Sequence, residues 1–510
     1  MKTGVMVAAL EDAFRRDPRS RAALLNYHSA AVASNEFARA EATFRSVLDA
    51  GSKDQRLQFL IIDLLLRQKK DPAAMTQIEA AMASLGVDDG ILSAALAVRD
   101  RLGLYRGKTN GGVSLCMIVK DEEEHLARCL HSAKPVVDEI IVVDTGSSDR
   151  SKGIARAYGA KVIEQAWEND FSKARNRSLA EASGDWIFVL DGDEVISPKD
   201  YELLRELLQT GPGASVAYTI QTRNYSYRLN TVGFQPNRGE FAEETGAGWF
   251  PSDKVRLFPN DTRVRFIYAV HEVVEPALIN NGIPIRRCDI PVHHYGKLSE
   301  ERTASKTILY HAMGREKLST ARTDPAALRE SAIQASHLGH HEEALDLWQR
   351  FVQIQPGSAE AFVNLASAFF NLRRYSEAAA SAEKAMALDP SLKEAHFNAA
   401  LANLILGRVD HAISILDPLV KAVPDYPSAG FILAACHACT GSETLFMESL
   451  RSLSSSALSN RLPISIADLA ERLLSSGQRG YASILLQSAV RHNYTSPEIS
   501  SLIKCCQPAA

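Results

Sequence analysis

The sequence predicts an α/β domain with a parallel or mixed sheet, flanked on both sides by all-α repeat domains. The chain has 510 residues, which is more than one hydrophobic core usually serves. Short apolar runs alternate with helical patterns in the middle, and a regular period marks the flanks. We expect a helical domain over residues 1–108, an α/β domain over 109–300, a helical linker over 301–330 and a repeat domain over 331–510.

Composition and charge exclude several classes of function. The apolar fraction of 46% is that of an ordinary globular protein, and the net charge of −4 argues against general nucleic-acid binding. Seven scattered cysteines, an odd number, argue against a secreted disulfide framework. Neither a signal peptide nor an apolar stretch of about 18 residues is evident, so no transmembrane segment is expected. We expect a cytoplasmic protein and leave peripheral contact with the inner membrane open.

The C-terminal flank contains an internal repeat. Prolines and alanines recur with one step of 34 residues (390 − 356 and 424 − 390): Pro356, Pro390 and Pro424, and Ala344, Ala378 and Ala412. A degenerate unit follows around Ala482, and the N-terminal flank has the same step between Ala40 and Ala74. The pattern resembles the tetratricopeptide repeat, a pair of antiparallel helices. Stacked repeats form a concave surface that suits a protein or peptide partner, and oligomerisation is the alternative use.

The middle of the chain alternates strands with helices. Four apolar or β-branched runs predict strands at 113–119, 139–144, 160–165 and 185–191, and helical patterns lie between them. This order predicts a Rossmann-like parallel sheet, and the continuous apolar strands indicate burial on both faces. The segment 233–248 has no period and four glycines, which predicts a mobile loop.

Three of the predicted strands run into polar clusters. The clusters are Lys120–Glu124, Asp144–Asp149 and Asp191–Glu194. Ligands of open α/β sheets bind beyond the carboxyl ends of the strands. We therefore expect the three clusters to meet at one edge of the sheet and to form the functional site.

The cluster Asp-Gly-Asp-Glu predicts a metal site. Neighbouring carboxylates repel one another but are favourable around a divalent cation such as Mg²⁺ or Mn²⁺, which also binds phosphate oxygens. Gly192 would let the backbone bend so that Asp191 and Asp193 approach one ligand. The alternative is an acidic turn in which Asp193 is a helix N-cap.

Together these motifs resemble an enzyme family. Inverting family 2 glycosyltransferases with the GT-A fold have motifs similar to SLCMIVKDEEEHLARCL, DEIIVVDTGSSDRS, WENDFSKARNRSLAEASGDWIFVLDGDE and the later KVRLF, VHE and HHYG. The resemblance covers about residues 112–297 and is strongest to lipopolysaccharide-core glucosyltransferases and bacterial peptide S-glycosyltransferases. It implies the fold of nucleotide-diphospho-sugar transferases and a nucleotide-sugar donor, with a UDP-sugar as the first choice.

The resemblance implies donor-binding roles for five residues. Val119 and Glu122 would border the nucleotide base and ribose, and Asp144 would hydrogen-bond the base. Arg175 would approach the base or the diphosphate, unless it is an ordinary arginine of a helix surface. Asp191 would lie near the ribose and the sugar.

The resemblance also implies how a metal is held. Asp193 would bind the cation that bridges the diphosphate, and a later histidine often completes the metal shell in such enzymes. The motif HHYG offers His293 and His294, and His294 fits the pattern better. A buried structural histidine is the alternative.

An inverting transfer needs a base for the acceptor and stabilisation of the departing diphosphate. We assign the base to Glu272 in AVHEVVE, with Asp253 and Glu275 as competitors and a structural salt bridge as the alternative. The sequence departs here from the Glu-Asp pair common in the wider family, which leaves the base open. The adjacent His271 would orient the leaving diphosphate.

Aromatic residues suggest an acceptor site. Tyr225, Tyr227 and Trp249 would stack on a sugar, although strand packing would use the same residues. We expect a metal-dependent glycosyltransferase acting on a protein or peptide that the repeats recruit. The rivals are transfer to lipopolysaccharide core or another envelope glycan, and a catalytically inactive scaffold. Homo-oligomerisation is left open.

Overall fold

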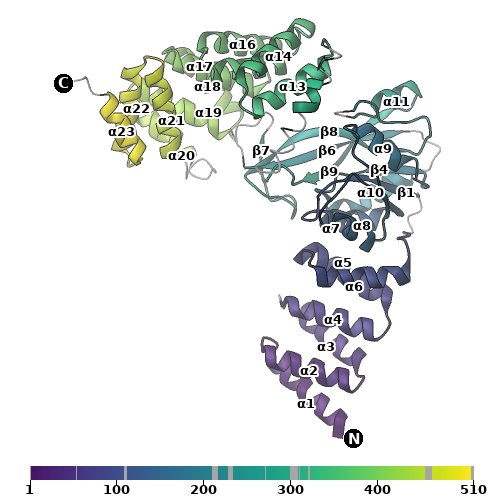
Figure 1. The fold of residues 1–510 in the computed structure, drawn as a ribbon. Coiled ribbons are helices and arrows are strands. Elements are labelled where there is room, and N and C mark those ends of the chain that lie inside the picture. Colours follow the sequence, from purple (N-terminus) through teal and green to yellow (C-terminus); the bar gives the residue numbers. More distant parts are fainter. Residues whose placement is uncertain are drawn as a thin grey trace. The chain divides into compact units, whose positions relative to one another are not determined.

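The computed structural model describes most of the chain. The described residues are 2–52, 54–107, 112–209, 216–227, 234–269, 272–298, 308, 311–316, 318–319, 322–424, 426–453 and 462–506. They form two compact units. The first consists of Met1–Arg223, Phe241–Glu243 and Ser252–Tyr295, and the second of Asn224–Glu240, Glu244–Pro251 and Gly296–Ala510. Figure 1 shows their helices and strands.

The first unit begins with helices. They are α1 (Lys2–Arg16), α2 (Arg21–Ala33), α3 (Phe37–Asp49), α4 (Gln55–Arg67), α5 (Asp71–Leu85) and α6 (Asp89–Leu102). The side chains of Ser20, Asp54 and Asp88 accept from the first turns of α2, α4 and α6, which satisfies amides that lack a partner within the helix. Ala40 and Ala74, the alanines of the repeat step, lie fully buried in one apolar cluster of these helices.

Helices α5 and α6 pack against the α/β part of the same unit. Glu79 on α5 is buried, and its carboxylate accepts from Arg99 at 2.8 Å and from Lys134 at 2.5 Å. Arg99 also donates to the carbonyl of Ala157, and Tyr158 donates to the carbonyl of Glu79 at 2.7 Å. Apolar side chains of α5, α6 and the sheet belong to one cluster. Buried ion pairs and apolar packing therefore join these helices to the sheet.

The sheet combines a parallel and an antiparallel half. Its strands are β1 (Val113–Val119), β2 (Glu139–Asp144), β3 (Lys161–Glu164), β4 (Trp186–Val189), β5 (Glu194–Ile196), β6 (Ala217–Ser226), β7 (Gln235–Pro236), β8 (Gly248–Pro259) and β9 (Ile285–His294). Their order is β3-β2-β1-β4-β8-β6-β9-β5, and β7 pairs with β8. The pairs among β1 to β4 are parallel, whereas β4–β8, β5–β9 and β7–β8 are antiparallel. The predicted α/β fold with a mixed sheet is confirmed.

Helices cover both faces of the parallel half. They are α7 (Leu126–Ala133), α8 (Ser151–Ala157), α9 (Phe171–Leu179), α10 (Tyr201–Gln209) and α11 (Glu275–Asn280), with short 3-10 turns η1 (Lys134–Val136) and η2 (Pro198–Asp200). On β1, Leu115 and Met117 belong to the apolar cluster of α7 and α8, whereas Cys116 belongs to that of α9 and α11. Alternate residues of a strand point to opposite faces, so both faces are buried, as the apolar runs indicated.

The second unit is mainly helical. Its helices are α13 (Pro325–His337), α14 (His341–Ile354), α15 (Ala359–Asn371), α16 (Tyr375–Leu388), α17 (Lys393–Ile405), α18 (Val409–Ala422), α19 (Pro427–Cys439), α20 (Glu443–Ser452), α21 (Leu462–Ser475), α22 (Arg479–Arg491) and α23 (Pro497–Cys506). Ala344, Ala378 and Ala412 occupy equivalent places in α14, α16 and α18 and are buried. The small side chain lets neighbouring helices approach closely, which explains the repeat step.

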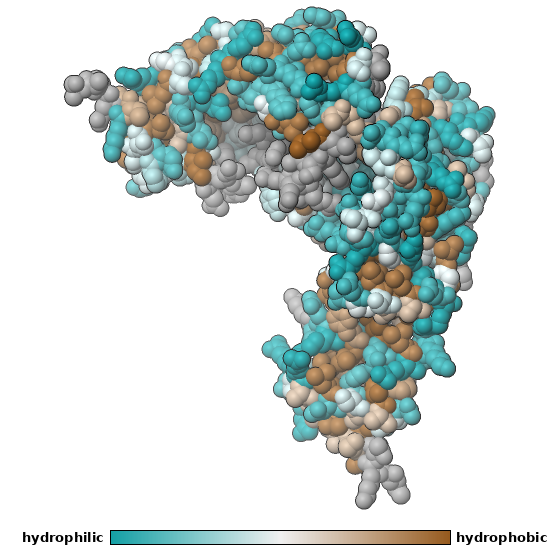
Figure 2. Space-filling view, in the orientation of Figure 1, coloured by the Kyte–Doolittle hydropathy of each residue, from teal (hydrophilic) through white to brown (hydrophobic). Residues whose placement is uncertain are grey.

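The surface of the N-terminal helices carries exposed apolar side chains. Examples are Val5, Met6, Leu25 and Phe59. Figure 2 shows hydrophobic residues in brown over the part of the chain that Figure 1 labels α1 to α6. Scattered residues of this kind are ordinary on protein surfaces. Among the described residues, no helix has both the length and the apolar composition that a membrane crossing requires.

Candidate active site

The polar clusters after β1 and β2 interlock through hydrogen bonds. The register pairs Val119 at the end of β1 with Asp144 at the end of β2. The amide of Asp121 donates to Ser147 Oγ at 3.0 Å, and the amide of Ser148 donates to Asp121 Oδ1 at 2.7 Å. The two loops therefore form one surface at the carboxyl edge of the sheet, as parallel neighbouring strands require.

The third cluster meets this surface through Gly192. A Cβ atom at Gly192 would lie 3.1 Å from Cγ of Glu122, which is itself buried. Gly192 does not have a positive φ, so its backbone conformation does not require glycine. The absence of a side chain here serves the close approach to Glu122. The loops after β1, β2 and β4 thus converge at one edge of the sheet.

Asp144 combines a satisfied and an unsatisfied carboxylate oxygen. Its side chain is buried at the end of β2, and Oδ1 accepts from the amides of Gly146 at 3.1 Å and Ser147 at 2.9 Å. Oδ2 has no hydrogen-bond partner among the described residues. A buried acceptor without a partner is unusual in a native protein and indicates a place for a donor from a ligand or water.

Arg175 on α9 joins two of the predicted site residues. Its Nη2 donates to Asp191 Oδ1, and its Nε donates to Glu272 Oε1 at 3.1 Å. Lys254 Nζ lies 3.3 Å from the other oxygen of Asp191. Only 7% of the Arg175 side chain is exposed, so it is not an ordinary surface arginine. Its Nη1 is buried and has no partner among the described residues.

The charges of this group reinforce one another. Burial opposes the charged form of Arg175, but the carboxylates of Asp191 and Glu272 raise its pKa above the ordinary value. Burial likewise opposes ionisation of Asp191, while the cationic side chains of Lys254, Arg175 and Arg256 hold its pKa well below the ordinary value. Asp191 is therefore a carboxylate throughout the physiological range.

The position of Glu272 depends on a residue that sequence reasoning missed. Asn176 donates through Nδ2 to the carbonyl of Phe266 at 2.9 Å and accepts the amide of Phe266 at 2.8 Å. A backbone bridge between Ile267 and Val273 then returns the chain to Glu272. The signal was present in FSKARN, because Asn176 directly follows Arg175.

Within the described part of the chain, the other two candidates for the base form no hydrogen bond or ion pair with Arg175. Asp253 has 47% of its side chain exposed and lies 4.0 Å from Arg287. Glu275 begins α11, and its Oε2 accepts the amide of Val274 at 2.9 Å. His271 lies outside the described residues.

Strand pairing brings Asp193 and His294 together. Antiparallel pairing of β5 with β9 sets Glu194 opposite His294, so that His294 Nε2 lies 3.4 Å from Asp193 Oδ1. The amide of Tyr295 donates to the carbonyl of Asp193 at 3.1 Å, which adds to this pairing. A carboxylate oxygen and an imidazole nitrogen at this spacing form a suitable donor set for a divalent cation.

His293, the alternative histidine, points into a different environment. It is fully buried, and its ring centroid lies 4.8 Å from that of Phe241. Burial, together with the positive charges of Arg223 and Arg128, lowers the pKa of His293 to about 3. His293 is therefore neutral at ordinary pH and matches the buried structural histidine that the sequence left open.

A second residue that sequence reasoning missed is Arg256, which fixes the last residue of the Asp-Gly-Asp-Glu cluster. Both Arg256 and Glu194 are fully buried, and two parallel hydrogen bonds of 2.6 and 2.5 Å join them. Glu194 Oε2 also accepts the amide of Asp191 at 2.8 Å. The ion pair thus supports the backbone that presents Asp191. Its sequence signal was only a basic residue in KVRLF.

The predicted acceptor residues divide by exposure. Tyr225 is fully buried and Trp249 is 6% exposed, which favours the strand-packing alternative for both. Tyr227 is 65% exposed and is available for a ligand. The segment predicted as a loop contains the short strand β7 within its described residues.

Comparisons with known proteins identify the families of two parts of the chain. Residues 114–261 match the model of glycosyl transferase family 2, and residues 29–86, 332–393 and 365–427 match the tetratricopeptide repeat. The chain thus carries a family 2 glycosyltransferase domain together with tetratricopeptide repeats. Both resemblances that the motifs and the 34-residue step suggested are confirmed.

Relatives in bacteria share parts of the chain. A TPR repeat-containing protein of Synechococcus elongatus is 41% identical over 177 residues, 34% of this chain and 38% of that protein. The SPbeta prophage-derived glycosyltransferase SunS of Bacillus subtilis is 26% identical over 261 residues, 50% of this chain and 57% of SunS. An uncharacterized glycosyltransferase of Rickettsia typhi is 39% identical over 87 residues, 17% of this chain and 29% of that protein. This chain therefore spans well under two thirds of these relatives.

Solved structures are also similar to part of the chain. The crystal structure of MamA matches with 20% identity and a TM-score of 0.28, covering 30% of this chain and 92% of MamA. That of PilW, a type IV pilus biogenesis factor, matches with 20% identity and a TM-score of 0.31, covering 40% of this chain and 94% of PilW.

Proposed function

We propose that this protein transfers a sugar from a nucleotide-diphosphate donor, a UDP-sugar in first place, to a protein or peptide. The observation that carries this proposal is a pair of buried polar atoms without partners among the described residues, Asp144 Oδ2 and Arg175 Nη1. One lies at the end of β2 and the other belongs to the group around Asp191, in a domain that matches glycosyl transferase family 2. We assign Asp144 to the base of the donor, with Val119 and Glu122 beside it.

We further propose a division of roles between the two aspartates. Asp191 is held by Arg175 and Lys254, which suits a residue that faces the ribose and sugar. Asp193 and His294 would hold Mn²⁺ or Mg²⁺, because their carboxylate and imidazole atoms lie 3.4 Å apart. A cation bound there would neutralise charge on the departing diphosphate.

Glu272 is our proposed base. Of the described residues, only Arg175 donates a hydrogen bond to it, from Nε to Glu272 Oε1, which leaves Oε2 to accept a proton. An acceptor hydroxyl or thiol would give its proton to Glu272 while its oxygen or sulfur attacks the anomeric carbon. The bond from that carbon to the diphosphate oxygen breaks on the opposite face, which inverts the configuration. His271 stays assigned to the leaving diphosphate.

The repeats would supply the acceptor. Tetratricopeptide repeats stack into extended concave surfaces, and such surfaces bind extended partners. We propose that a protein or peptide acceptor binds there, and that the enzyme works in the cytoplasm. All seven cysteines are unpaired thiols, which fits a reducing compartment.

Donor binding and turnover test the proposal together. UDP with Mn²⁺ should raise the melting temperature of the protein more than UDP alone, and one nucleotide sugar should be hydrolysed slowly without an acceptor. Mass spectrometry of a cell lysate treated with enzyme and donor should show one added sugar mass on a protein. No stabilisation by any common nucleotide and no turnover would refute the enzyme assignment.

Two variants separate the proposed roles. Asp193→Ala should abolish the part of the stabilisation that depends on Mn²⁺, and Glu272→Gln should remove transfer while sparing donor binding. Asp261→Asn is the matched control, because Asp261 is also a carboxylate paired with an arginine, Arg263, at 2.6 Å. Asp261 follows the end of β8 that pairs with Trp186 at the amino end of β4, whereas the site lies at the carboxyl end of that strand. Normal transfer by Glu272→Gln would show that its contact with Arg175 is only a salt bridge.

A further inference from the structure

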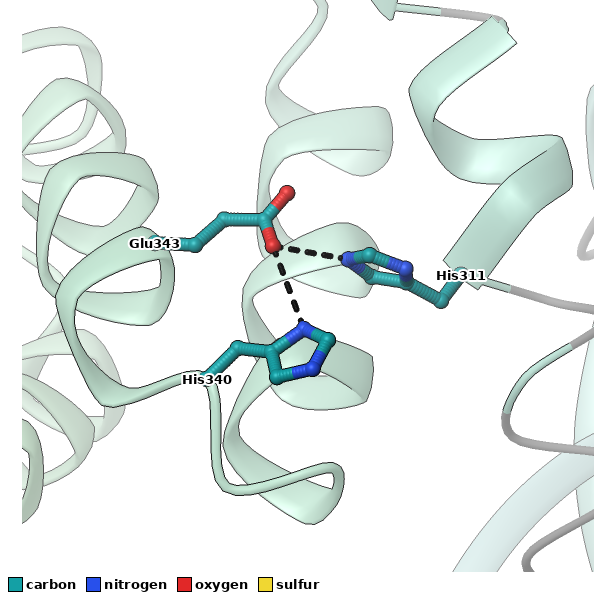
Figure 3. A group of neighbouring side chains, drawn as sticks. All are labelled: His311, His340 and Glu343. Atoms are coloured by element: carbon teal, nitrogen blue, oxygen red, sulfur yellow. Dashed lines mark hydrogen bonds and ion pairs between the residues drawn. The ribbon is translucent and has the colours of Figure 1, made fainter.

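The second unit contains a group of three side chains that the proposed transfer does not use. Glu343 Oε2 lies 3.0 Å from His311 Nε2 and 3.5 Å from His340 Nδ1. The three nitrogen and oxygen atoms lie within 4.8 Å of one another. Figure 3 shows both imidazole rings pointing toward the carboxylate of Glu343.

We propose that His311, His340 and Glu343 bind a transition-metal ion of the zinc type. Zinc takes imidazole nitrogen and carboxylate oxygen at about 2.0–2.2 Å in tetrahedral geometry, which places neighbouring ligand atoms about 3.3–3.5 Å apart. The distances from Glu343 Oε2 to the two histidine nitrogens, 3.0 and 3.5 Å, lie close to that separation, and the two nitrogens lie within 4.8 Å of each other. Two histidines and a single carboxylate favour zinc, cobalt, nickel or copper over magnesium and calcium, which prefer oxygen ligands.

The ligands come from separate elements of the second unit. His311 belongs to a helical segment at residues 311–316, His340 is the N-cap residue of α14, and Glu343 lies in the first turn of α14. A bound ion would therefore join this segment to the first pair of repeat helices. Because the positive end of a helix dipole repels cations, the carboxylate of Glu343 at that end is a necessary part of the site.

The exposure of the three side chains and the position of the neighbouring Arg315 both leave room for a metal ion. Glu343 also lines an open pocket of about 650 Å³, together with Arg315, Arg322 and Arg350, so its carboxylate is in contact with solvent. The side chain of His340 is 54% exposed, whereas that of His311 is only 10% exposed. Arg315 Nε lies 4.0 Å from Glu343 Oε1, but its side chain is 69% exposed and can turn into solvent. A ring-edge contact between the two imidazoles, with centroids 5.3 Å apart, already holds them side by side.

Zinc titration of the full chain tests this proposal. After removal of metals with a chelator, we expect one zinc equivalent that His311→Ala, His340→Ala and Glu343→Gln each weaken by more than about 100-fold. This expectation follows because losing a second-sphere partner alone costs about 10–100-fold. Cobalt in the same site should give a visible absorption spectrum that the three variants lose. Equal zinc affinity and stoichiometry in the wild type and all three variants would overturn the proposal.

Two controls keep the result specific. His492 Nε2 lies 3.1 Å from Glu443 Oε2, in a His–Glu pair that has only one histidine. The variant His492→Ala should therefore leave the zinc equivalent unchanged. Asp193→Ala alters the proposed donor-site metal and should also leave this equivalent in place, which separates the two sites. Because His340 is exposed, His340→Ala keeps the test valid if His311→Ala fails to fold. A loss of zinc in His492→Ala equal to that in the three variants would show non-specific binding and refute the site.

Discussion

Replacing Arg256 with methionine should remove the support beneath Asp191. The side chains of Arg256 and Glu194 are 2% and 1% exposed, so the variant leaves a carboxylate buried without its cation. Arg256 also donates to the carbonyl of Val189 at 3.2 Å and to Thr222 Oγ1 at 2.9 Å, and both bonds are lost. Methionine fills similar apolar volume, so the change tests the charge more than the packing.

The magnitude follows from the burial of the pair. Breaking a buried ion pair by removing one partner costs about 3–5 kcal/mol, a large part of the 5–15 kcal/mol that typically stabilises a domain. The exposed pair of Arg263 and Asp261 provides a control, because 66% of the Arg263 side chain is exposed. Arg263→Met should cost about 0–1 kcal/mol. Glu194→Leu combined with Arg256→Met removes both charges and should recover much of the stability.

Hydrogen exchange measured by mass spectrometry provides the assay, because it reports local opening of each segment. Peptides from β4 and β5 should exchange about two to four orders of magnitude faster in Arg256→Met, since about 1.4 kcal/mol corresponds to tenfold. Urea unfolding should show the matching loss of stability. The reasoning is refuted if Arg256→Met behaves like Arg263→Met, or if the double variant is less stable than the single one.

Two further predictions concern positioning and pH. Asn176→Ala removes both hydrogen bonds to the backbone of Phe266, so it should cost about 1–3 kcal/mol and slow transfer while UDP binding persists. Calorimetry with UDP and a transfer assay check this, and unchanged transfer would contradict the role given to Asn176. Burial opposes ionisation of Glu139, but hydrogen bonds, first from Ser114 and then from Ser183, lower its pKa below 4.5. The unfolded state therefore binds the proton of Glu139 more tightly than the folded state does. The ionised Glu139 stabilises the folded protein above about pH 4.5, and this contribution is lost as the pH falls. Glu139→Gln should show a smaller drop in melting temperature between pH 7 and pH 3, and parallel curves would contradict it.

Local sequence patterns determined the elements and the outline of the site. The apolar runs at 113–119 and 139–144 became β1 and β2 with the same bounds, because buried parallel strands need continuous apolar residues. The 34-residue step marked the buried alanines of the helix pairs. Polar clusters after the strands indicated the functional edge, since parallel neighbours end on the same side.

Only the tertiary structure decided how the charges pair. Arg175 and Glu272 are 97 residues apart, and Arg256 and Glu194 are 62 apart. No local periodicity encodes these contacts. The first depends on the contacts of Asn176 with Phe266 and on the bridge between Ile267 and Val273, and the second joins β8 to β5 within the antiparallel half of the sheet. The pairing of β5 with β9 places His294 beside Asp193. The sequence by itself thus determined the elements and supplied the candidate residues, because these follow from local patterns, and the long-range contacts of the tertiary structure decided which of the candidates touch.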